Sequence, residues 1–158
     1  ALDAQVHLAS SQGERTVSFA EFMVAPKRTA RLPGELITGV TVPVLTGWQG
    51  YSKVGVRNAM VIATASAALV VDTAGRNVRL ALGAVGPVIL RCPDAEELIA
   101  VHADFGDRRV AAEIVEEFAA LARATARPID DHRSTADYRR HAIGVLAARL
   151  LRRAFPHE

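Results

Sequence analysis

Residues 128–140 read Pro-Ile-Asp-Asp-His-Arg-Ser-Thr-Ala-Asp-Tyr-Arg-Arg, a turn followed by the start of a helix. Ser134 has the side chain of an N-cap residue, which accepts a hydrogen bond from a free amide of the first helical turn. Asp130 and Asp131 precede it, where the helix dipole favours negative charge. We therefore predict a capped amphipathic helix over Thr135–Phe155 that packs on a core. Its expected inward stripe, at three- and four-residue spacing, comprises Tyr138, Ala142, Val145, Leu146, Arg149 and Leu150.

The charged cluster before this helix has two interpretations. Asp130, Asp131 and His132 are metal-ligating residue types, but consecutive residues rarely converge on one ion. No second histidine or carboxylate cluster lies nearby in the sequence, and Arg133 is a closer partner for the two acids. We therefore predict a structural role for Asp130, Asp131, Arg133 and Ser134, and no metal site.

The period of hydrophobicity changes once along the chain, from that of strands to that of helices. Short runs bounded by turn residues predict six strands, at Gln5–Ala9, Thr16–Phe19, Ile37–Val44, Tyr51–Val56, Met60–Asp72 and Val78–Leu82. After Cys92 the spacing becomes helical, over Asp94–Ala100, Asp107–Thr125 and Thr135–Phe155. Strands followed by helices are typical of an α+β fold. We expect an antiparallel β-sheet covered on one face by about three helices.

The composition is typical of a soluble globular domain with its own core. Of the 158 residues, 50% are apolar and 23% are charged, and a chain of this size buries roughly 68–70% of its unfolded surface. The formal net charge is only +2, because acids nearly balance the basic residues, and this disfavours a nucleic-acid partner. The single cysteine, Cys92, fits a reducing cytoplasm, and no apolar run is long enough to span a membrane. We expect a cytoplasmic protein.

Four motifs carry a resemblance to one protein family. The run at residues 128–140 resembles the end of the FAD-binding (medium) subunit of molybdenum hydroxylases, the family of carbon monoxide dehydrogenase and xanthine dehydrogenase. Residues 32–37, Leu-Pro-Gly-Glu-Leu-Ile, are similar to the motif that ends the main flavin-binding domain of that subunit. Residues 51–63 are similar to the family's aromatic-x-Lys-Val-x-x-Arg-x-Ala-Met-Asp-Ile-Ala, and residues 80–87 to its Ala-Leu-Gly-Gly-Val-Ala-Pro. The four motifs follow the family's order and together span most of the chain.

The resemblance implies a division into domains. Residues 1–45 correspond to the tail end of the preceding FAD-binding domain and a linker, and residues 46–158 to the flavoprotein carboxy-terminal α+β domain. The family's glycine-rich phosphate-binding turns, Ala-Gly-Gly-x-Ser and Thr-Ile-Gly-Gly, do not occur in this sequence. We therefore expect the carboxy-terminal part of a longer flavin subunit, left by gene truncation, proteolysis or engineering. Alone, it should bind FAD weakly or not at all.

Two residues are candidates for contacts with FAD, both by resemblance. Lys53 matches the family lysine that reaches the edge of the isoalloxazine ring, where a cation favours the reduced, anionic flavin. Ile37 matches an apolar residue that packs near the same ring. From the residue types alone, Lys53 is a solvated strand residue and Ile37 a strand core residue. Val61 departs from the family pattern, which has aspartate before Ile-Ala, so Arg57 lacks its expected partner.

The residues alone form no self-sufficient catalytic constellation. The Gly83–Gly86 run lacks the lysine–serine pair of a nucleotide-binding loop, and Cys92 precedes a proline and is expected to be buried. The resemblance implies that a molybdopterin large subunit oxidises the substrate, [2Fe-2S] clusters of a small subunit relay electrons, and FAD passes them to an external acceptor. In this interpretation the chain helps to cover FAD in an oxidoreductase. The alternative is a non-catalytic assembly module that binds no cofactor by itself.

Overall fold

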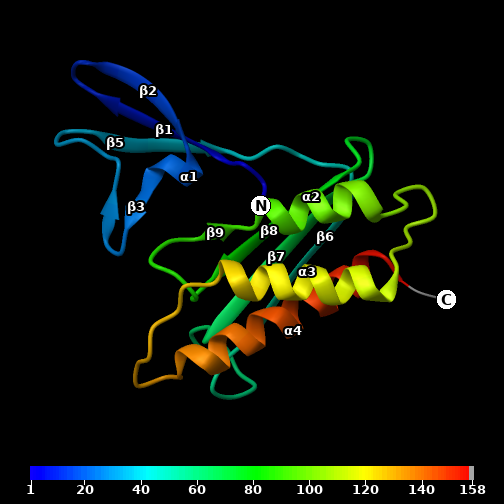
Figure 1. The fold of residues 1–158 in the computed structure, drawn as a ribbon. Coiled ribbons are helices and arrows are strands. Elements are labelled where there is room, and N and C mark those ends of the chain that lie inside the picture. The colour runs from blue at the N-terminus through cyan, green and yellow to red at the C-terminus, as the bar shows by residue number, and fades with distance from the viewer. Residues whose placement is uncertain (157–158) are drawn as a thin grey trace. The chain divides into compact units, whose positions relative to one another are not determined.

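The computed structural model describes residues 1–156, which divide into two compact units. Residues 46–156, with Ala1, form the carboxy-terminal unit, and Leu2–Leu45 form the amino-terminal unit. Figure 1 shows the helices and strands of both. Each unit has its own hydrophobic cluster and is described by itself.

The carboxy-terminal unit contains a four-stranded antiparallel sheet in the order β6-β7-β8-β9. Its strands are β6 (Gly47–Val54), β7 (Ala65–Asp72), β8 (Asn77–Gly83) and β9 (Leu90–Arg91). In β6, a Cβ atom at Gly50 would lie 2.2 Å from the Trp48 ring, so glycine lets the indole lie flat on the strand and pack against the core. Because successive side chains alternate, each strand has one face toward the core and one away from it.

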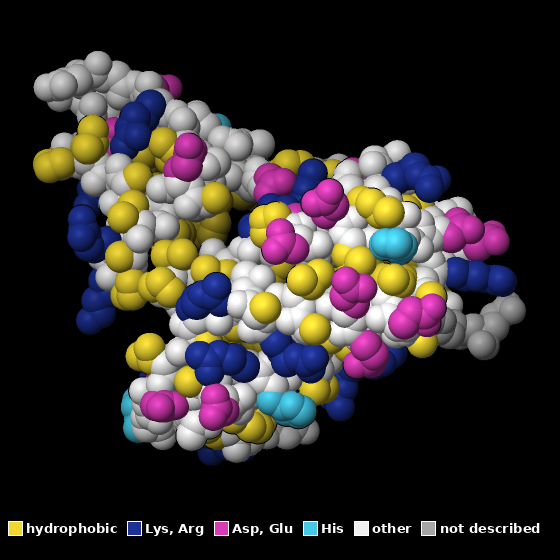
Figure 2. Space-filling model, in the orientation of Figure 1, with side chains coloured by type: hydrophobic (Ala, Val, Ile, Leu, Met, Phe, Trp, Pro, Cys, Tyr) yellow, Lys and Arg dark blue, Asp and Glu magenta, His cyan; other side chains and the backbone are white. Residues whose placement is uncertain are grey.

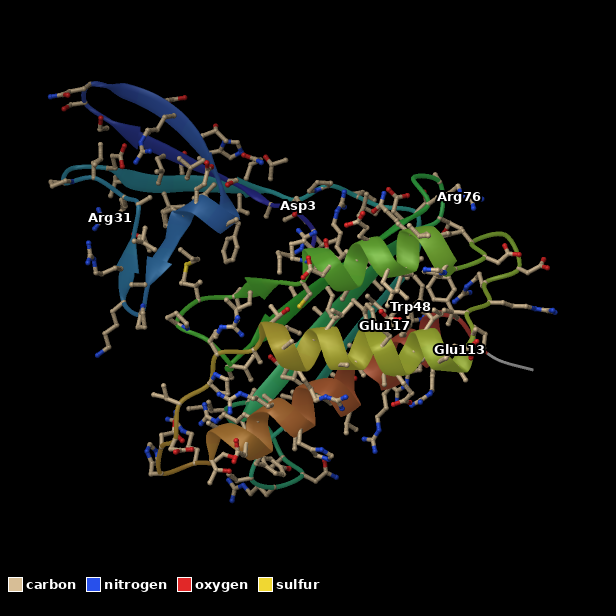
Figure 3. All side chains as sticks on the ribbon, in the orientation of Figure 1. Asp3, Arg31, Trp48, Arg76, Glu113 and Glu117 are labelled. Carbon is tan, nitrogen blue, oxygen red and sulfur yellow. The ribbon has the colours of Figure 1, made fainter. Side chains whose placement is uncertain are left out.

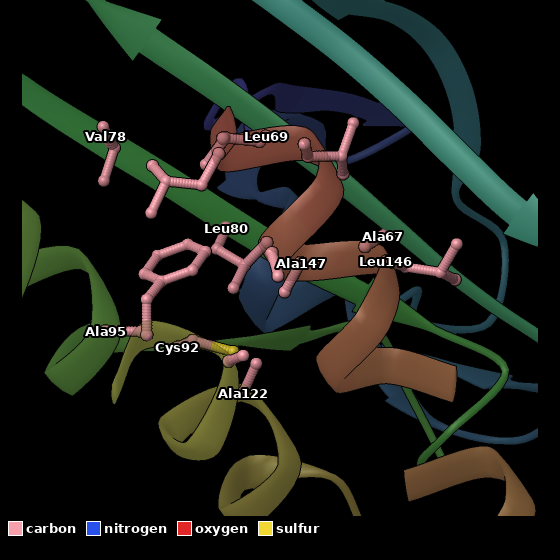
Figure 4. Packing of buried hydrophobic residues seen from close by; sticks show 14 of the residues in the cluster. Ala67, Leu69, Val78, Leu80, Cys92, Ala95, Ala122, Leu146 and Ala147 are labelled. Atoms are coloured by element: carbon pink, nitrogen blue, oxygen red, sulfur yellow. The ribbon is translucent and has the colours of Figure 1, made fainter. Parts of the chain in front are cut away.

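Three helices among the described residues cover the inward face of this sheet (Figure 1). They are α2 (Pro93–His102), α3 (Ala112–Thr125) and α4 (Ala136–Ala154). Leu69 of β7, Leu80 of β8 and Phe118 of α3 are fully buried, and Cys92 lies in the same core (Figure 4). The predicted fold class, an antiparallel sheet covered on one face by helices, is confirmed.

The inward face of α4 is wider than the predicted stripe and is rotated by about one residue. Tyr138 is 48% exposed and Arg149 is exposed, so these two assignments are wrong. The helix packs against α3 as well as against β6 and β7, and it therefore buries two adjacent rows of side chains. The buried set is Arg139, Ala142, Ile143, Leu146, Ala147, Leu150, Leu151 and Ala154, with Gly144 and Ala148.

The amino-terminal unit contains a three-stranded antiparallel sheet, β2-β1-β5, and a separate two-stranded hairpin, β3-β4. Its elements are β1 (Gln5–Ser10), β2 (Gly13–Ser18), α1 (Phe19–Phe22), β3 (Met23–Ala25), β4 (Arg28–Thr29) and β5 (Leu36–Thr41). The core is small, with only Val6, Leu8 and Phe22 buried in it. Ser18 and Glu21 form a capping box at the start of α1.

Every strand predicted from the sequence is present, but the ends and the shortest elements differ. The segment Met60–Thr64 was predicted as strand and is a loop, and β7 begins only at Ala65. The four-residue α1 and the two- or three-residue strands β3, β4 and β9 were missed. Elements this short contain too few residues to show a period.

The cap of α4 is displaced by one residue from its predicted position. Thr135 is the N-cap, and its side chain accepts a hydrogen bond from the Tyr138 amide, so the assignment of this role to Ser134 is wrong. Asp130 Oδ1 accepts from the Ala136 amide at 2.5 Å and satisfies a second free donor of the first turn. Asp130 therefore contacts the first turn of α4 through the Ala136 amide.

The predicted pairing of Arg133 with the acids is also wrong. The Arg133 side chain is exposed and makes no ion pair within residues 1–156. Asp131 Oδ1 instead accepts from the Arg133 and Ser134 amides and from Arg139 Nη2 at 2.7 Å. The amide of Arg133 and then the guanidinium of Arg139 lower the pKa of Asp131. The cationic partner of Asp131 is thus Arg139, a buried residue of α4.

Arg139 also fixes the loop that follows β8. It is 7% exposed, and its Nη1 donates to the Ala84 carbonyl at 3.1 Å. Ala84 has a φ of +60°, a left-handed conformation that costs an L-residue roughly 1–2 kcal/mol relative to glycine. The Val85 carbonyl of the same loop accepts from the Arg127 amide at 2.7 Å. The loop is therefore held by hydrogen bonds in a conformation that its own sequence disfavours.

Ala84→Gly should stabilise the chain, because glycine adopts positive φ without steric cost and the exposed alanine methyl group contributes no packing. We expect a gain of roughly 0.5–1 kcal/mol in the free energy of unfolding, measured by chemical denaturation. The matched control is Ala120→Gly on the exposed side of α3, which should lose about 1 kcal/mol. Destabilisation by both variants would contradict the strain assigned to Ala84.

Arg139→Met should lower the melting temperature substantially, because it removes the hydrogen bonds to Asp131 and Ala84 while it keeps an apolar stem. Arg133→Met should change the free energy of unfolding by less than roughly 0.5 kcal/mol, as for other exposed residues. The pKa of Asp131 is lowered in the folded state, so its contribution is present above the ordinary carboxyl range and is lost as the pH falls. The difference in melting temperature between the wild type and Arg139→Met should therefore become smaller in acid. Equal decreases in melting temperature in Arg139→Met and Arg133→Met at neutral pH would contradict the pairing of Asp131 with Arg139.

Candidate functional site

The sheet face that the helices leave uncovered has a regular arrangement of residues. The strand register places Lys53 opposite Ser66 and Ser66 opposite Gly83, and in the next row Tyr51 opposite Ala68 and Ala68 opposite Ala81. Directly opposed residues of antiparallel strands point to the same face. The intervening residues of β7 and β8 are in the core, so these two rows lie on the outward face. We call this set, Tyr51, Lys53, Ser66, Ala68, Ala81 and Gly83, the open face.

The centre of the open face has only short side chains, and Ser66, Ala81 and Gly83 there are buried. No side chain of Ser66, Ala68, Ala81 or Gly83 is longer than serine. A Cβ atom at Gly83 would lie 2.5 Å from Ser66 Oγ, so position 83 excludes even a methyl group unless Ser66 moves. Ser66 Oγ makes no hydrogen bond within residues 1–156 and keeps its donor and acceptor capacity. Ser66 is only 8% exposed and Ile89 Cδ1 lies 3.6 Å from a Cβ built at Gly83, so this hydroxyl is recessed between its neighbours.

Lys53 is the cation of its row of the open face, whereas the row of Tyr51 continues across Ala81 to Arg91 of β9, which is paired with Glu96. The Lys53 side chain is exposed, and its Nζ donates to the Val61 carbonyl at 2.7 Å. The acceptor is neutral, and Lys53 makes no ion pair with any residue of the described chain. The ammonium group therefore keeps its full charge and two further N–H donors, at a position fixed by the backbone.

The loop of residues 55–63 is held without the aspartate of the family pattern. The Val61 side chain folds over Gly55, where a Cβ atom would lie 2.5 Å from Val61 Cγ2. The Thr64 amide donates to the Val54 carbonyl at 2.7 Å and closes the loop. Arg57 is exposed, and no residue of the described chain forms an ion pair with it. Valine at position 61 therefore replaces a polar anchor by side-chain packing and presents its carbonyl to Lys53.

Ile37 belongs to the amino-terminal unit and is 52% exposed on β5, opposite Leu8 of β1. Its interpretation as a strand core residue is therefore wrong within this unit. Leu36 and Val40 of the same strand are also more than half exposed, and β5 pairs only with β1. Ile37 is thus available for contact, whereas Lys53 lies in the other unit.

The cavity of the amino-terminal unit was not predicted from the sequence. It measures about 330 Å³ and lies between the tip of the β1–β2 hairpin and the Leu32–Glu35 turn. Arg15 donates to both oxygens of Glu35, at 2.6 and 2.9 Å, and the Leu32 amide donates to the same carboxylate. The hydrogen bond from Arg15 and then that from Leu32 lower the pKa of Glu35 to about 2. Because the guanidinium is committed to Glu35, the lining residues offer no free cation to a phosphate.

The remaining candidates do not form a reactive centre. Burial raises the pKa of the Cys92 thiol to about 11, which keeps it protonated and unreactive. The Asp130–Ser134 cluster serves the start of α4, as described above. In residues 1–156 no group of three or more histidine, cysteine or carboxylate side chains is placed to bind a metal ion. No helix in that range has both the length and the apolar character needed to cross a membrane.

Comparisons with known proteins match both parts of the chain. The sequence profile described as "CO dehydrogenase flavoprotein C-terminal domain" matches residues 51–154, and that described as "FAD binding domain in molybdopterin dehydrogenase" matches residues 1–45. The glyceraldehyde dehydrogenase medium chain of Sulfolobus acidocaldarius is 30% identical over 96% of this chain and 53% of its own length. The carbon monoxide dehydrogenase medium chain of Afipia carboxidovorans is 29% identical over 97% of this chain and 52% of its own. The chain thus spans about half the length of these relatives.

Solved structures agree with the sequence matches. Carbon monoxide dehydrogenase from Hydrogenophaga pseudoflava superposes with a TM-score of 0.83 at 28% identity, over 98% of this chain and 53% of that one. The quinoline 2-oxidoreductase of Pseudomonas putida, at 23% identity and a TM-score of 0.82, supports the fold alone. The family assignment made from the four sequence motifs is confirmed. The match over residues 51–154 includes the whole open face, and the chain belongs to the CO dehydrogenase flavoprotein C-terminal domain family.

Proposed function

We propose that this chain is the carboxy-terminal part of the flavin subunit of a molybdenum hydroxylase, and that its open face covers one side of FAD. Residues 1–45 are then the end of the FAD-binding domain with a linker, and residues 46–158 the carboxy-terminal domain. The family matches over residues 1–45 and 51–154 support this division. FAD, when bound, takes electrons from iron–sulfur clusters and passes them to an external acceptor.

The fixed cation beside short side chains is the observation that carries the proposal. Lys53 holds its ammonium group against a backbone carbonyl without a neutralising acid, beside the small residues Ser66 and Gly83. A positive charge near an isoalloxazine ring stabilises the ring when it gains negative charge on reduction. Lys53 therefore positions a charge that raises the reduction potential, and Ser66 Oγ offers one hydrogen bond to a polar edge.

The residues present fit the ring end of FAD rather than its phosphate end. The open face combines short side chains, a cation and a hydroxyl, which suit a ring with polar edges. The phosphates need backbone amides of glycine-rich turns, which this sequence lacks, and the guanidinium at the amino-terminal cavity is paired with Glu35. Ile37 of β5, exposed and apolar, suits a further contact with the ring.

The proposal includes partners, because the relatives are named as medium chains. We infer a large molybdopterin subunit that oxidises the substrate and a small subunit with [2Fe-2S] clusters, in a cytoplasmic complex. The second candidate function is a non-catalytic assembly module that binds no cofactor by itself. The absence of the glycine-rich turns from the sequence favours it for the chain alone.

FAD titrated into the purified chain should bind weakly or not at all, because the ring contacts are present and the phosphate contacts are absent. Quenching of flavin fluorescence measures this, with free FAD in buffer as the baseline. Submicromolar binding would show that the chain has a complete cofactor site and would contradict the assignment of the missing contacts to other segments. In the assembled complex, a colourless preparation without flavin absorbance would favour the assembly module.

Lys53→Met in a flavin-loaded, full-length subunit should lower the midpoint potential of FAD, because the stem is kept and the charge is lost. A charge effect of about 1–3 kcal/mol corresponds to roughly 20–65 mV for a two-electron couple. Lys27→Met is the matched control, since Lys27 is the other lysine of the chain and lies outside the open face. A potential unchanged in Lys53→Met would return Lys53 to the role of a solvated strand residue.

A further inference from the structure

The orientation of the Ser66 hydroxyl is fixed by packing alone. Ser66 Oγ makes no hydrogen bond within residues 1–156, and the side chain is recessed on β7 between Lys53 and Gly83. A Cβ atom at Gly83 would lie 2.5 Å from Ser66 Oγ, so the hydroxyl lies directly against the backbone of Gly83. Serine adopts staggered rotamers that point its O–H in different directions. The rotamer available to Ser66 therefore depends on where the backbone of Gly83 lies.

The loop that follows Gly83 is held by residues outside it. Ala84, the next residue, has a φ of +60°, and its methyl group is exposed. Packing of its own side chain therefore does not hold Ala84 in this disfavoured conformation. Arg139 Nη1 donates to the Ala84 carbonyl at 3.1 Å, and the Arg127 amide donates to the carbonyl of buried Val85 at 2.7 Å. Of these two contacts, the one from Arg139 acts on the residue that adjoins Gly83.

Arg139 has the geometry to link two segments. Figure 2 shows basic side chains spread over the outer surface of the helices, whereas Arg139 is only 7% exposed. Its Nη2 donates to Asp131 Oδ1 at 2.7 Å, before the start of α4, while Nη1 contacts Ala84. A guanidinium is planar, so a contact at one Nη atom limits the positions that the other can take. The ion pair with Asp131 therefore helps to fix the direction in which Arg139 meets the Ala84 carbonyl.

We propose that Arg139 is a positioning residue for the Ser66 hydroxyl, which donates a hydrogen bond to a polar edge of the flavin ring. Arg139 acts by way of the Ala84 carbonyl on the backbone of Gly83, and that backbone sets the rotamer of Ser66. The inference rests on the proposed function, because it requires the ring to lie over the open face. A displaced hydroxyl loses one hydrogen bond to FAD, which weakens binding roughly three- to tenfold. It also lowers the midpoint potential, because a donor to the ring stabilises added negative charge.

A double-mutant cycle between Ser66 and Arg139 tests this link. FAD is titrated into the flavin-free, full-length subunit and followed by flavin fluorescence, and the midpoint potential of the loaded subunit is measured, for Ser66→Ala, Arg139→Met and the double variant. Each single variant should bind FAD roughly three- to tenfold more weakly and have a lower potential. The double variant should lose no more than about a further twofold in affinity, because both changes remove the same hydrogen bond. Losses that multiply in the double variant would show independent effects and overturn the proposal.

Arg108→Met is the matched control for destabilisation. Arg108 also binds a backbone carbonyl, that of Ala154, at the opposite end of α4 from Arg139. Figure 3 labels Glu113 of α3 at this end of the helices. The melting temperature of Arg108→Met should fall, while its FAD affinity should stay within about twofold of the wild type and its potential should be unchanged. An equal loss of FAD affinity in Arg108→Met and Arg139→Met would indicate general destabilisation and overturn the proposal.

Asp131→Asn provides a second test if Arg139→Met does not fold. Asparagine keeps an oxygen acceptor for the Arg133 and Ser134 amides but lacks the charge that binds Arg139. FAD binding should weaken in Asp131→Asn and should not weaken further when Ser66→Ala is added. Loss of FAD affinity in Ser66→Ala but in neither Arg139→Met nor Asp131→Asn would overturn the positioning role.

The Lys53→Met variant separates this inference from the proposed function. If Lys53→Met lowered the midpoint potential and Ser66→Ala changed neither potential nor affinity, the positioning role would fail and the proposed function would stand. If neither Lys53→Met nor Ser66→Ala changed the potential or the FAD affinity, both would be overturned.

Discussion

The arrangement of the carboxy-terminal unit depends on one buried guanidinium. Arg139 joins the turn before α4, through Asp131, to the loop after β8, through the Ala84 carbonyl. That loop begins next to Gly83, which the strand register aligns with Ser66 and Lys53. The row of residues that forms one end of the open face is therefore anchored by a helix on the other side of the sheet. Arg139 Nε is buried and has no hydrogen-bond partner within residues 1–156, a desolvation cost that the contacts of Nη1 and Nη2 offset. The strained φ of Ala84 is possible for the same reason, because a hydrogen bond from a rigid helix holds the residue in place.

The fold could be predicted from the sequence because its signals are local and repeated. Strand alternation from β1 to β8 and the helical spacing after Cys92 each extend over several residues, and the motifs identified the family.

The residues of the candidate site were harder to predict from the sequence. The cap of α4 was assigned to Ser134 instead of Thr135, because two neighbouring hydroxyl residues satisfy the same rule and only the backbone conformation distinguishes them. Proximity in sequence favoured Arg133 as the partner of the acids. In the structure Asp131 pairs instead with Arg139, in the first turns of α4. Ser66 gave no sequence signal at all, because its relation to Lys53 exists only through strand register.

Arginine and lysine side chains occupy different kinds of position in this chain. The chain has many arginines and only two lysines, Lys27 and Lys53. Several arginines bind backbone carbonyls or carboxylates inside the fold. Arg108 donates twice to the Ala154 carbonyl at the end of α4, and Arg127 donates to the Ala124 and Ala126 carbonyls at the end of α3. A planar guanidinium with five donors suits such work, whereas an ammonium group is a compact, strongly hydrated point charge. Both lysines are exposed and without acidic partners in the described chain, one on the open face and one at a hairpin tip. Cations of this kind contribute little to the stability of the fold.

The two units differ in the size of their hydrophobic cores. The carboxy-terminal unit buries a continuous core from two strands and three helices, including Leu69, Phe118 and Ile143. The amino-terminal unit buries three apolar side chains and leaves Leu36, Ile37 and Val40 of β5 exposed on both faces of the strand. Chains below about 40 residues rarely fold without added support, and this unit is close to that limit. It compensates with polar contacts, notably the paired hydrogen bonds of Arg15 to Glu35 and the bridge from Thr16 through His7 to Thr41. Such contacts define a conformation but add little net stability, so the exposed apolar residues of β5 are where further packing would stabilise this unit most.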